Sequence, residues 1–225
     1  MSAKKITPQK KKYQILLVDD HPIMREGFTQ LINHHPDLHV CAHAGNAAKA
    51  LDSLTTFKPD LAIVDIALNG TSGIELIKNI HSRWPEQLIL ALSMHEESVH
   101  GERALRAGAR GYVMKNEATE EIMRAIREVL KGEVYLSKEM RSIVVQKFLN
   151  GEQNNGRSGI DQLSDRELEV FQLIGGGRKT SQIAAELHLS VKTVETYRAH
   201  IKEKLNLRDG MELVRHAIQW MGNHQ

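Results

Sequence analysis

The sequence predicts an α/β domain built on a doubly wound parallel sheet, followed by a second, smaller all-α domain. Short apolar runs alternate with helical patterns over the first part of the chain, which is the order expected of a parallel sheet covered on both faces. The segment 151–159 (GEQNNGRSG) contains no apolar residue and predicts a flexible linker. Helical patterns alone follow that linker.

Five apolar runs are the predicted strands, because they are short and bounded by turn residues. Between the strands, apolar residues recur at the three- and four-residue spacing of a half-buried helix, most clearly over 46–57 and 122–129. The five predicted strands cover residues 13–18, 38–44, 61–64, 87–92 and 111–114.

Start and stop signals divide the rest of the chain into helices. A helical segment over 137–150 precedes the linker, and Ser164 with Glu167 forms a capping box for a helix that runs to about residue 174. Thr180 or Ser181 is predicted to cap the next, short helix. The later predicted segments are that short helix through 187, a tight turn at 188–190, and helices over 191–205 and 211–221.

These elements divide the chain into four segments. A basic tail covers 1–12 and the α/β domain 13–135. A helix and the linker cover 136–160, and the helical domain covers 161–225.

Composition limits the class of protein. The chain has 225 residues, 41% of them hydrophobic and 26% charged, which is enough for two domains that each bury a core. Its longest apolar stretches, such as 88–92, fall far short of the roughly 20 residues that span a bilayer. No signal-peptide core follows the basic tail, and Cys41 is the only cysteine. We therefore expect a cytoplasmic protein with no membrane partner.

The net charge of +2 hides an uneven distribution. Residues 1–12 sum to +5, residues 13–150 to −3, and residues 161–225 to zero, with 9 basic and 9 acidic side chains. Bulk charge therefore does not indicate DNA binding. Within 192–208, however, five basic residues accompany two acidic ones, so any basic surface must be local.

Ionisable residues follow three of the predicted strands. Asp19 and Asp20 follow the first, Asp65 the third and Lys115 the fifth, and the carboxyl ends of parallel strands meet at one edge of a sheet. Taken singly, Asp20 could cap a helix that begins at Pro22, Asp65 could be a turn residue, and Lys115 could be a solvated charge. Together, three carboxylates beside one lysine fit Mg²⁺, which prefers oxygen ligands.

The first 130 or so residues resemble the receiver domain of bacterial two-component response regulators, which has a flavodoxin-like (βα)5 fold. The resemblance rests on the motifs LLVDDHP, LAIVDIALNGTSG, LALSM and GYVMK. It implies that Asp65 accepts a phosphoryl group from a sensor histidine kinase. It also implies a Mg²⁺ site and a switch around the acceptor. The implied residues are Asp19, Asp20, Asp65 and the carbonyl of Ala67 for the metal, Lys115 and Ser93 for the phosphoryl oxygens, and Tyr112 as the aromatic that follows Ser93 inward.

The implied chemistry suits these residue types. Phosphoryl transfer depends on positioning and charge neutralisation more than on covalent help, and Mg²⁺ with Lys115 would supply positive charge. The product places about −1.5 to −2 charges where one carboxylate stood. The Ser93 hydroxyl can swing toward the new oxygens and open space beside Tyr112. That movement would give a two-state switch on the face made by the fourth helix, fifth strand and fifth helix.

The sequence departs from the common receiver pattern at three positions. Asn69 and Asn116 stand where many receivers have proline, and Asn116 bears on the local loop geometry because a cis peptide is cheap only before proline. Ala67 offers a carbonyl but no side chain that could place a hydrolytic water. The sequence therefore does not set the lifetime of the phosphorylated form.

Residues Leu163 to Trp220 resemble the LuxR-type helix-turn-helix, on the motifs LSDRELEVFQLI, TSQIAAELHLS and VKTVETYRAHIKEKLNL. With the receiver, this resemblance points to the NarL/FixJ type, in which a phosphorylated receiver frees or dimerises the helix-turn-helix. The short helix, tight turn and longer helix agree with that reading, because the longer helix can enter a major groove. Six apolar residues should face one another across the turn, namely Ile183, Ala184, Leu187, Val194, Ile201 and Leu205.

The opposite face of the longer helix carries the candidate DNA contacts, although on an isolated helix such residues would form an ordinary solvated face. Glu195 could accept from a cytosine amino group or instead orient Arg198. By family analogy the base-edge candidates are Glu195, Thr196 and Ala199, and the phosphate candidates are Thr180, Lys192, Thr193, Arg198 and Lys202. The implied partners are a histidine kinase, double-stranded DNA, a second copy when phosphorylated, and RNA polymerase.

Two other classes of protein compete with this reading. A phosphoryl hydrolase usually has a second aspartate two residues after the nucleophile, and here that position is Ala67. A constitutive DNA-binding or docking module would not need the acidic site, and the complete set of site residues argues against it. We therefore expect a regulator and no enzymatic activity beyond its own phosphorylation and dephosphorylation.

Overall fold

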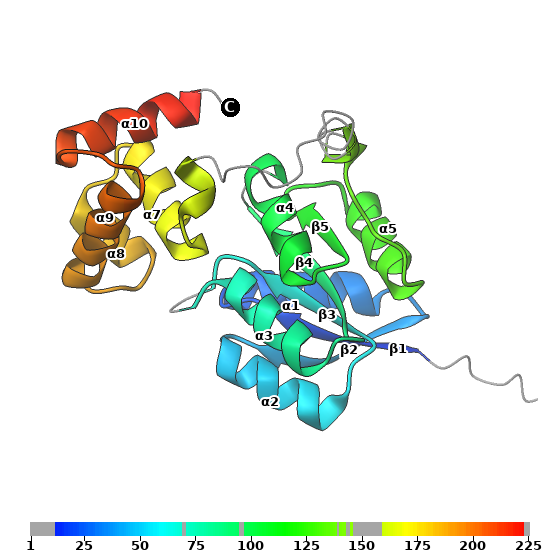
Figure 1. Cartoon of the computed structure of the whole chain (residues 1–225). Helices are drawn as coiled ribbons and strands as arrows, with labels where there is room; N and C mark the ends of the chain where they lie inside the picture. Colours follow the sequence, from blue (N-terminus) through cyan, green and yellow to red (C-terminus); the bar gives the residue numbers. More distant parts are fainter. Residues whose placement is uncertain are drawn as a thin grey trace, which may run out of the picture.

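The computed structural model describes residues 12–68, 71–94, 97–138, 140–142, 145 and 159–222. They form a sheet-containing domain and a helical domain (Figure 1). The predicted helix over 137–150 is helical at the described positions 138, 140–142 and 145. Of the predicted linker 151–159, residues 151–158 lie outside the described residues and Gly159 begins a 3-10 turn. In the described part of the chain, no helix is both long enough and apolar enough to span a bilayer.

Five parallel strands form the sheet of the first domain. They are β1 (Tyr13–Val18), β2 (Leu38–Ala44), β3 (Leu61–Asp65), β4 (Leu88–Ser93) and β5 (Gly111–Met114). Their order is β2-β1-β3-β4-β5, so the direction of winding reverses between β1 and β3. This order confirms the predicted doubly wound parallel sheet of the flavodoxin-like type.

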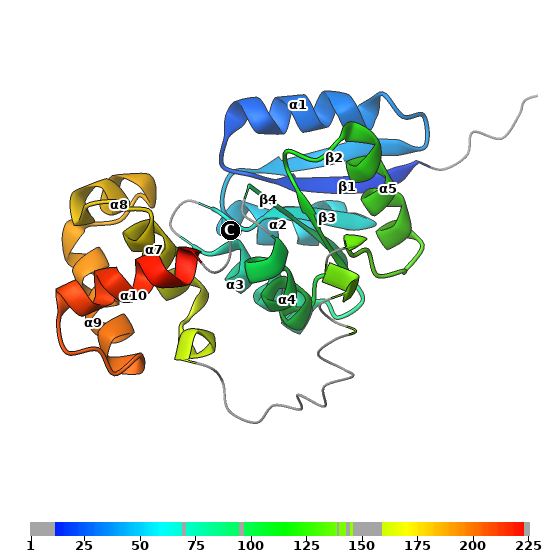
Figure 2. The same ribbon diagram turned by 90° about the horizontal axis from the view of Figure 1, so that it is seen from above.

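Two groups of helices cover the sheet, because successive residues of each strand point to opposite faces. One core cluster packs the helices α2 (Ala47–Phe57), α3 (Gly73–Arg83) and α4 (Glu97–Ala107) against one face. The other packs α1 (Pro22–Asn33) and α5 (Thr119–Leu130) against the opposite face. Figure 2 shows α1 on one side of the sheet and α3 with α4 on the other.

The start of α1 differs from the sequence expectation. His21, and not Asp20, occupies the N-cap position and makes no side-chain cap hydrogen bond. Instead the Asp19 carboxylate accepts a hydrogen bond of 2.7 Å from the backbone N–H of His21. Pro22 at the first helical position has no N–H and so removes one of the donors that would otherwise lack a partner there.

The second domain contains helices alone among its described residues. They are the 3-10 turn η1 (Gly159–Gln162) and the helices α7 (Asp165–Gly175), α8 (Thr180–Glu186), α9 (Val191–Lys204) and α10 (Gly210–Gly222). The predicted capping box of Ser164 and Glu167 is present at the start of α7. The six apolar residues expected across the turn between α8 and α9 all belong to its core.

The cap of α8 is a correction to the prediction. Lys179 occupies the N-cap position, and Thr180 is already the first helical residue. The side chain of Gln182 accepts a hydrogen bond of 2.9 Å from the backbone N–H of Lys179. That bond ties the first turn to the chain before it, so no hydroxyl cap is required at Thr180 or Ser181.

Candidate functional site

Acidic residues gather at the carboxyl edge of the sheet, where the winding reverses between β1 and β3. Asp19 directly follows β1, Asp65 is the last residue of β3, and both are buried. Lys115 follows β5, and its Nζ lies 2.6 Å from Oδ2 of Asp19 and 2.7 Å from Oδ2 of Asp65. The residues that the sequence placed at three strand ends therefore meet in one site.

Asp20 and His21 extend the acidic side of this site. Nδ1 of His21 lies 2.8 Å from Oδ1 of Asp20. One possible ligand atom from each of Asp19, Asp20, His21 and Asp65 lies within 4.8 Å of the others. Three carboxylates here face one ammonium group, and such an oxygen-rich, negatively charged set fits a hard divalent cation.

Burial dominates the electrostatics of Asp65. Desolvation raises the pKa of its carboxyl from 3.8 to about 6, although the charge and hydrogen bond of Lys115 work in the opposite direction. Burial also works to lower the pKa of Lys115, but Asp65 and Asp19 outweigh it and hold that pKa above its ordinary value. At neutral pH the site therefore contains mainly a carboxylate at Asp65 and an ammonium at Lys115.

The predicted switch residues lie on β4, which is next to the strand of Asp65, and on β5, the strand beyond it. Ser93 is the last residue of β4 and Tyr112 belongs to β5, and both are buried. The backbone carbonyl of Ser93 accepts a hydrogen bond of 2.7 Å from the N–H of Lys115, which ties the two strand ends together. Tyr112 packs in the core cluster beneath α3 and α4. The N–H of Ala67 donates to Oδ1 of Asp65 over 3.1 Å.

Two residues that the sequence reasoning missed shape the site. A Cβ added to Gly73 would lie 2.0 Å from the backbone carbonyl oxygen of Asp65, so only glycine lets α3 begin this close to Asp65. The guanidinium of Arg25 donates to the backbone carbonyl of Asp19 over 2.5 Å and holds the turn after β1. The TSG motif before α3 could have indicated Gly73, because it marks the start of the helix. Arg25 gave no such indication, because it resembles an ordinary solvent-exposed charge on an amphipathic helix.

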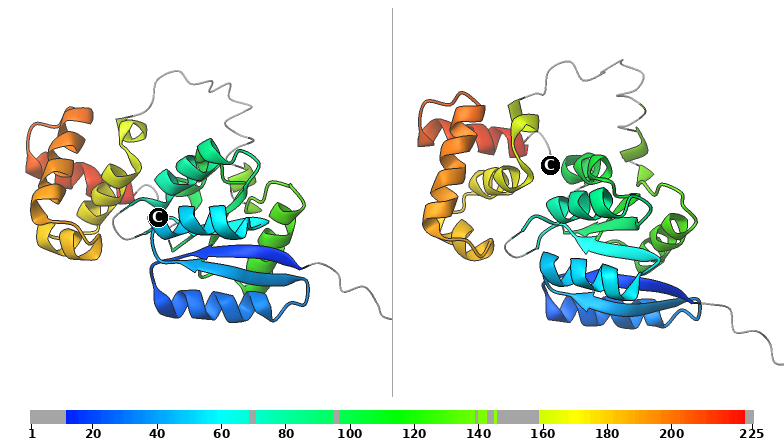
Figure 3. Two further views of the ribbon diagram at one scale, coloured as in Figure 1. Left: turned by 90° about the horizontal axis from the view of Figure 1, so that it is seen from below. Right: turned by 60° about the horizontal axis from the view of Figure 1, so that its bottom comes forward.

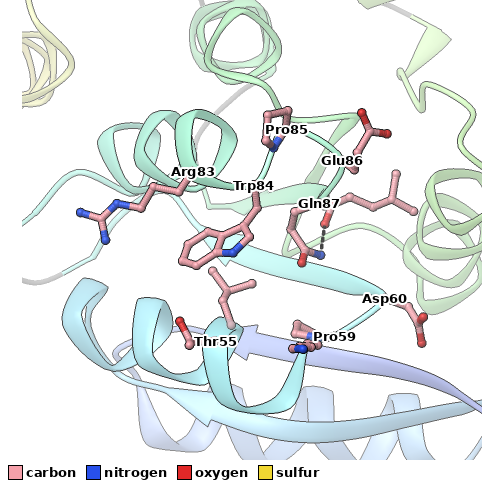
Figure 4. Close-up of a pocket in the computed structure, with 11 residues that line it drawn as sticks. Thr55, Pro59, Asp60, Arg83, Trp84, Pro85, Glu86 and Gln87 are labelled. Carbon is pink, nitrogen blue, oxygen red and sulfur yellow. Dashed lines mark hydrogen bonds between the residues drawn. The ribbon is translucent and has the colours of Figure 1, made fainter.

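A groove of about 680 Å³ lies elsewhere in this domain, lined by residues that include Pro59, Asp60, Arg83 and Trp84 (Figure 4). These residues flank the amino ends of β3 and β4. The groove therefore lies at the opposite edge of the sheet from Asp65 and is no part of the acidic site.

The DNA-reading face predicted on α9 is open to solvent. Its base-edge candidates Glu195, Thr196 and Ala199 are all exposed, whereas Val194 and Ile201 are buried against the other helices. The phosphate candidates are exposed or half-buried. The Thr193 hydroxyl is engaged with the Ser190 cap, and the Thr196 hydroxyl donates to the carbonyl of Lys192 over 3.1 Å. We call Lys192, Glu195, Thr196, Ala199 and Lys202 the α9 face.

Known proteins resemble both domains. Residues 15–127 match the family described as response regulator receiver domain, and residues 161–217 match the family described as bacterial regulatory proteins, luxR family. The oxygen regulatory protein NreC of Staphylococcus haemolyticus (strain JCSC1435) is 36% identical over 210 residues, which cover 92% of this chain and 97% of that protein.

Solved structures show the same architecture. A LuxR-family two-component response regulator from Aurantimonas sp. SI85-9A1 is 34% identical with a TM-score of 0.58, over 62% of this chain and 99% of that chain. RcsB of Salmonella enterica serovar Typhimurium, solved on the rprA promoter with the phosphomimetic BeF3⁻, shares the fold at 22% identity and a TM-score of 0.59, over 92% and 98% of the two chains. The chain is therefore a two-component response regulator of the NarL/FixJ type, in which a receiver domain is joined to a LuxR-type helix-turn-helix.

Proposed function

We propose that Asp65 is the phosphoryl acceptor of this response regulator, and that its phosphorylation by a sensor histidine kinase controls transcription through the helix-turn-helix domain. One observation carries the proposal. The Asp65 carboxylate is buried at a strand end, 2.7 Å from the ammonium of Lys115 and within the reach of two further carboxylates. Such a site suits the transfer of a charged group.

The transfer itself requires a nucleophilic carboxylate. An Oδ atom of Asp65 forms the new bond to phosphorus, while the bond from phosphorus to the kinase imidazole breaks and its electron pair stays with the imidazole nitrogen. Lys115, which pairs with Asp65 before transfer, is placed to pair with a phosphoryl oxygen after it.

A divalent cation fits the same site. Asp19, Asp20, Asp65 and the backbone carbonyl of Ala67 would hold Mg²⁺. When bound, Mg²⁺ supplies positive charge that offsets the charge of the incoming phosphoryl group. Lys115 pairs with both Asp19 and Asp65 but offsets only one of their two negative charges.

The new charge would reach the rest of the receiver through Ser93 and Tyr112. Both are buried, Ser93 on the strand beside that of Asp65 and Tyr112 on the strand beyond it, so a move of the Ser93 side chain toward the phosphoryl oxygens changes the packing around Tyr112. Interiors are close-packed, and such a change displaces the adjoining helix α4. The output then passes to the DNA-binding domain, whose α9 face would contact DNA, with two copies on one site.

Acetyl phosphate with Mg²⁺ tests the acceptor directly. We expect intact-mass measurement to show one added phosphoryl group on the wild type and on Asp52→Asn, an exposed control substitution in α2. Asp65→Asn should remain unlabelled because the amide is a poor nucleophile. Equal labelling of Asp65→Asn and the wild type would contradict the assignment.

A further inference from the structure

A cluster of charged contacts joins the two domains. No local sequence pattern predicts it. Arg103 of α4 donates to the backbone carbonyls of Leu163, over 2.8 Å, and Ile160, over 3.1 Å. The same guanidinium lies 3.2 Å from Oδ1 of Asp165, the first residue of α7. One receiver side chain therefore holds three groups at the start of the DNA-binding domain.

A second receiver helix holds the same carboxylate. Nζ of Lys78, on α3, lies 2.9 Å from Oδ2 of Asp165, which is almost completely buried. Asp165 is thus clamped between two cations from two helices, and such a buried charge is costly to leave unpaired. We call Lys78, Arg103 and Asp165 the interdomain clamp.

Contacts on either side of the clamp extend it over the length of α7. Nε2 of the buried His100, on α4, lies 3.1 Å from Oε1 of Gln172. Arg166 is buried, and it approaches the carbonyl of Leu68, three residues after the acceptor, at 3.4 Å. The receiver surface that docks α7 therefore includes α3, α4 and the loop that follows Asp65.

The α9 face lies on the other side of the DNA-binding domain. In Figures 1 and 3, α7 lies between the receiver and α9. The side chains of Glu195, Thr196 and Ala199 are exposed although the domains are in contact. Docking through the interdomain clamp thus leaves the predicted base-contacting residues of α9 exposed.

We propose that the α3–α4 face of the receiver is a docking surface for α7, and that the docked chain still binds DNA through α9. The inference rests on the proposed DNA-binding function. It means that the receiver does not control α9 by covering it. Docking instead fixes the position of the receiver relative to α9. It thereby determines how two copies of the chain can bind neighbouring sites on DNA.

A zero-length crosslink tests whether a docked chain binds DNA. A water-soluble carbodiimide joins Lys78 to Asp165 as an amide with loss of water, because their charged atoms are already in contact. The probe is a labelled duplex recovered by the full-length chain from a random pool. We expect the crosslinked monomer, identified by peptide mass, to bind this duplex within about twofold of its control.

Lys78→Arg is the matched control. It keeps the positive charge at the clamp but cannot form the amide, while other couplings, such as that of Lys204 to Glu167 at 2.6 Å, still occur. A loss of affinity of tenfold or more in the locked chain relative to the treated control would overturn the proposal. So would the absence of the Lys78–Asp165 crosslink. If the treated and untreated controls both fail to bind any recovered duplex, the DNA-binding function itself is wrong.

Arg103→Met supplies an independent measurement without chemical treatment. Loss of its three contacts should lower the yield of the Lys78–Asp165 crosslink several-fold. Binding of the monomer to the same duplex should stay within about twofold of wild type. A rise in affinity of tenfold or more would show that docking hides α9 and would contradict the proposal.

Discussion

Asp65 shows how one side chain balances reactivity against stability. Burial withholds water from the carboxylate and raises its pKa to about 6, while Lys115 keeps it ionised at neutral pH. The sequence predicted that Lys115 and the acidic residues meet at the strand ends but not the size of the desolvation, because burial depends on how α3 and α4 close over the strand ends. Because water does not solvate this carboxylate, any reaction or ligand that offsets its negative charge is favoured.

The pKa shift predicts a pH-dependent stability difference. Between about pH 4 and pH 6 the native state retains a proton on Asp65 that the unfolded chain has released, so stability falls as pH rises through that window. Asp65→Asn carries no such charge. At pH 7.5 without metal, urea unfolding should show it to be more stable than wild type by about 3 kcal/mol, since the pKa of Asp65 rises from 3.8 to about 6 on folding and one pKa unit corresponds to about 1.4 kcal/mol.

The same comparison at lower pH provides the control. The advantage of Asp65→Asn should shrink as pH falls and disappear below about pH 3, because wild-type Asp65 is then protonated in both the native and the unfolded state. Mg²⁺ at pH 7.5 should also reduce it, since a cation that binds the native carboxylate stabilises the wild type. A difference that stays constant from pH 4 to pH 7.5 would show that burial does not raise this pKa.

The elements that position the site depend on close approach as much as on pattern. All five strands were predictable from apolar runs, yet Asp65 and Ser93 prove to be the last strand residues and not loop residues. Hydrogen bonding to the neighbouring strand determines where each strand ends. The pattern of apolar residues within one strand does not show where that pairing stops. The glycine at the start of α3 was likewise invisible to helical periodicity, because its role is to leave room for the Asp65 backbone.

Gly73→Ala should therefore be destabilising. The new methyl group would lie 2.0 Å from the Asp65 carbonyl oxygen, so α3 must shift away from Asp65. We expect a loss of about 2 kcal/mol in urea unfolding, within the usual range for overpacking, together with slower labelling by acetyl phosphate. Gly27→Ala is the control, because nothing lies within 4 Å of a Cβ there and alanine favours the helix interior. Equal stability of the two variants would contradict this role.

The predicted DNA contacts of the α9 face can be tested at Lys202. Lys202→Ala removes a candidate phosphate contact, so DNA affinity should fall for all sequences and the slope of log affinity against log salt should decrease by about 1. Lys49→Ala, on the exposed start of α2 in the receiver, should leave both quantities unchanged. Fluorescence anisotropy over a salt series measures the slope. An unaltered slope for Lys202→Ala would remove that residue from the interface.

At the scale of the whole molecule, the sequence predicted two domains but not how they meet. The capping-box pattern already accounted for acidic residues at the start of α7. Nothing in the sequence therefore indicated that Asp165 has a partner in the receiver. Lys78 and Arg103 lie 87 and 62 residues earlier in the chain, and no periodicity links such positions. Domain docking is decided by surfaces that exist only after each domain has folded. Docking places Arg166 of α7 beside the carbonyl of Leu68, in the loop that follows Asp65, where a change at Asp65 can alter the contact.

Phosphorylation of Asp65 should change the affinity of this chain for DNA. The most direct measurement is the affinity of the wild type and Asp65→Asn for a duplex recovered by the full-length chain, with and without acetyl phosphate and Mg²⁺. We expect the phosphodonor to raise the affinity of the wild type at least tenfold and to leave that of Asp65→Asn unchanged. A labelled wild type whose DNA affinity does not change, or an equal response of both proteins, would contradict the claim.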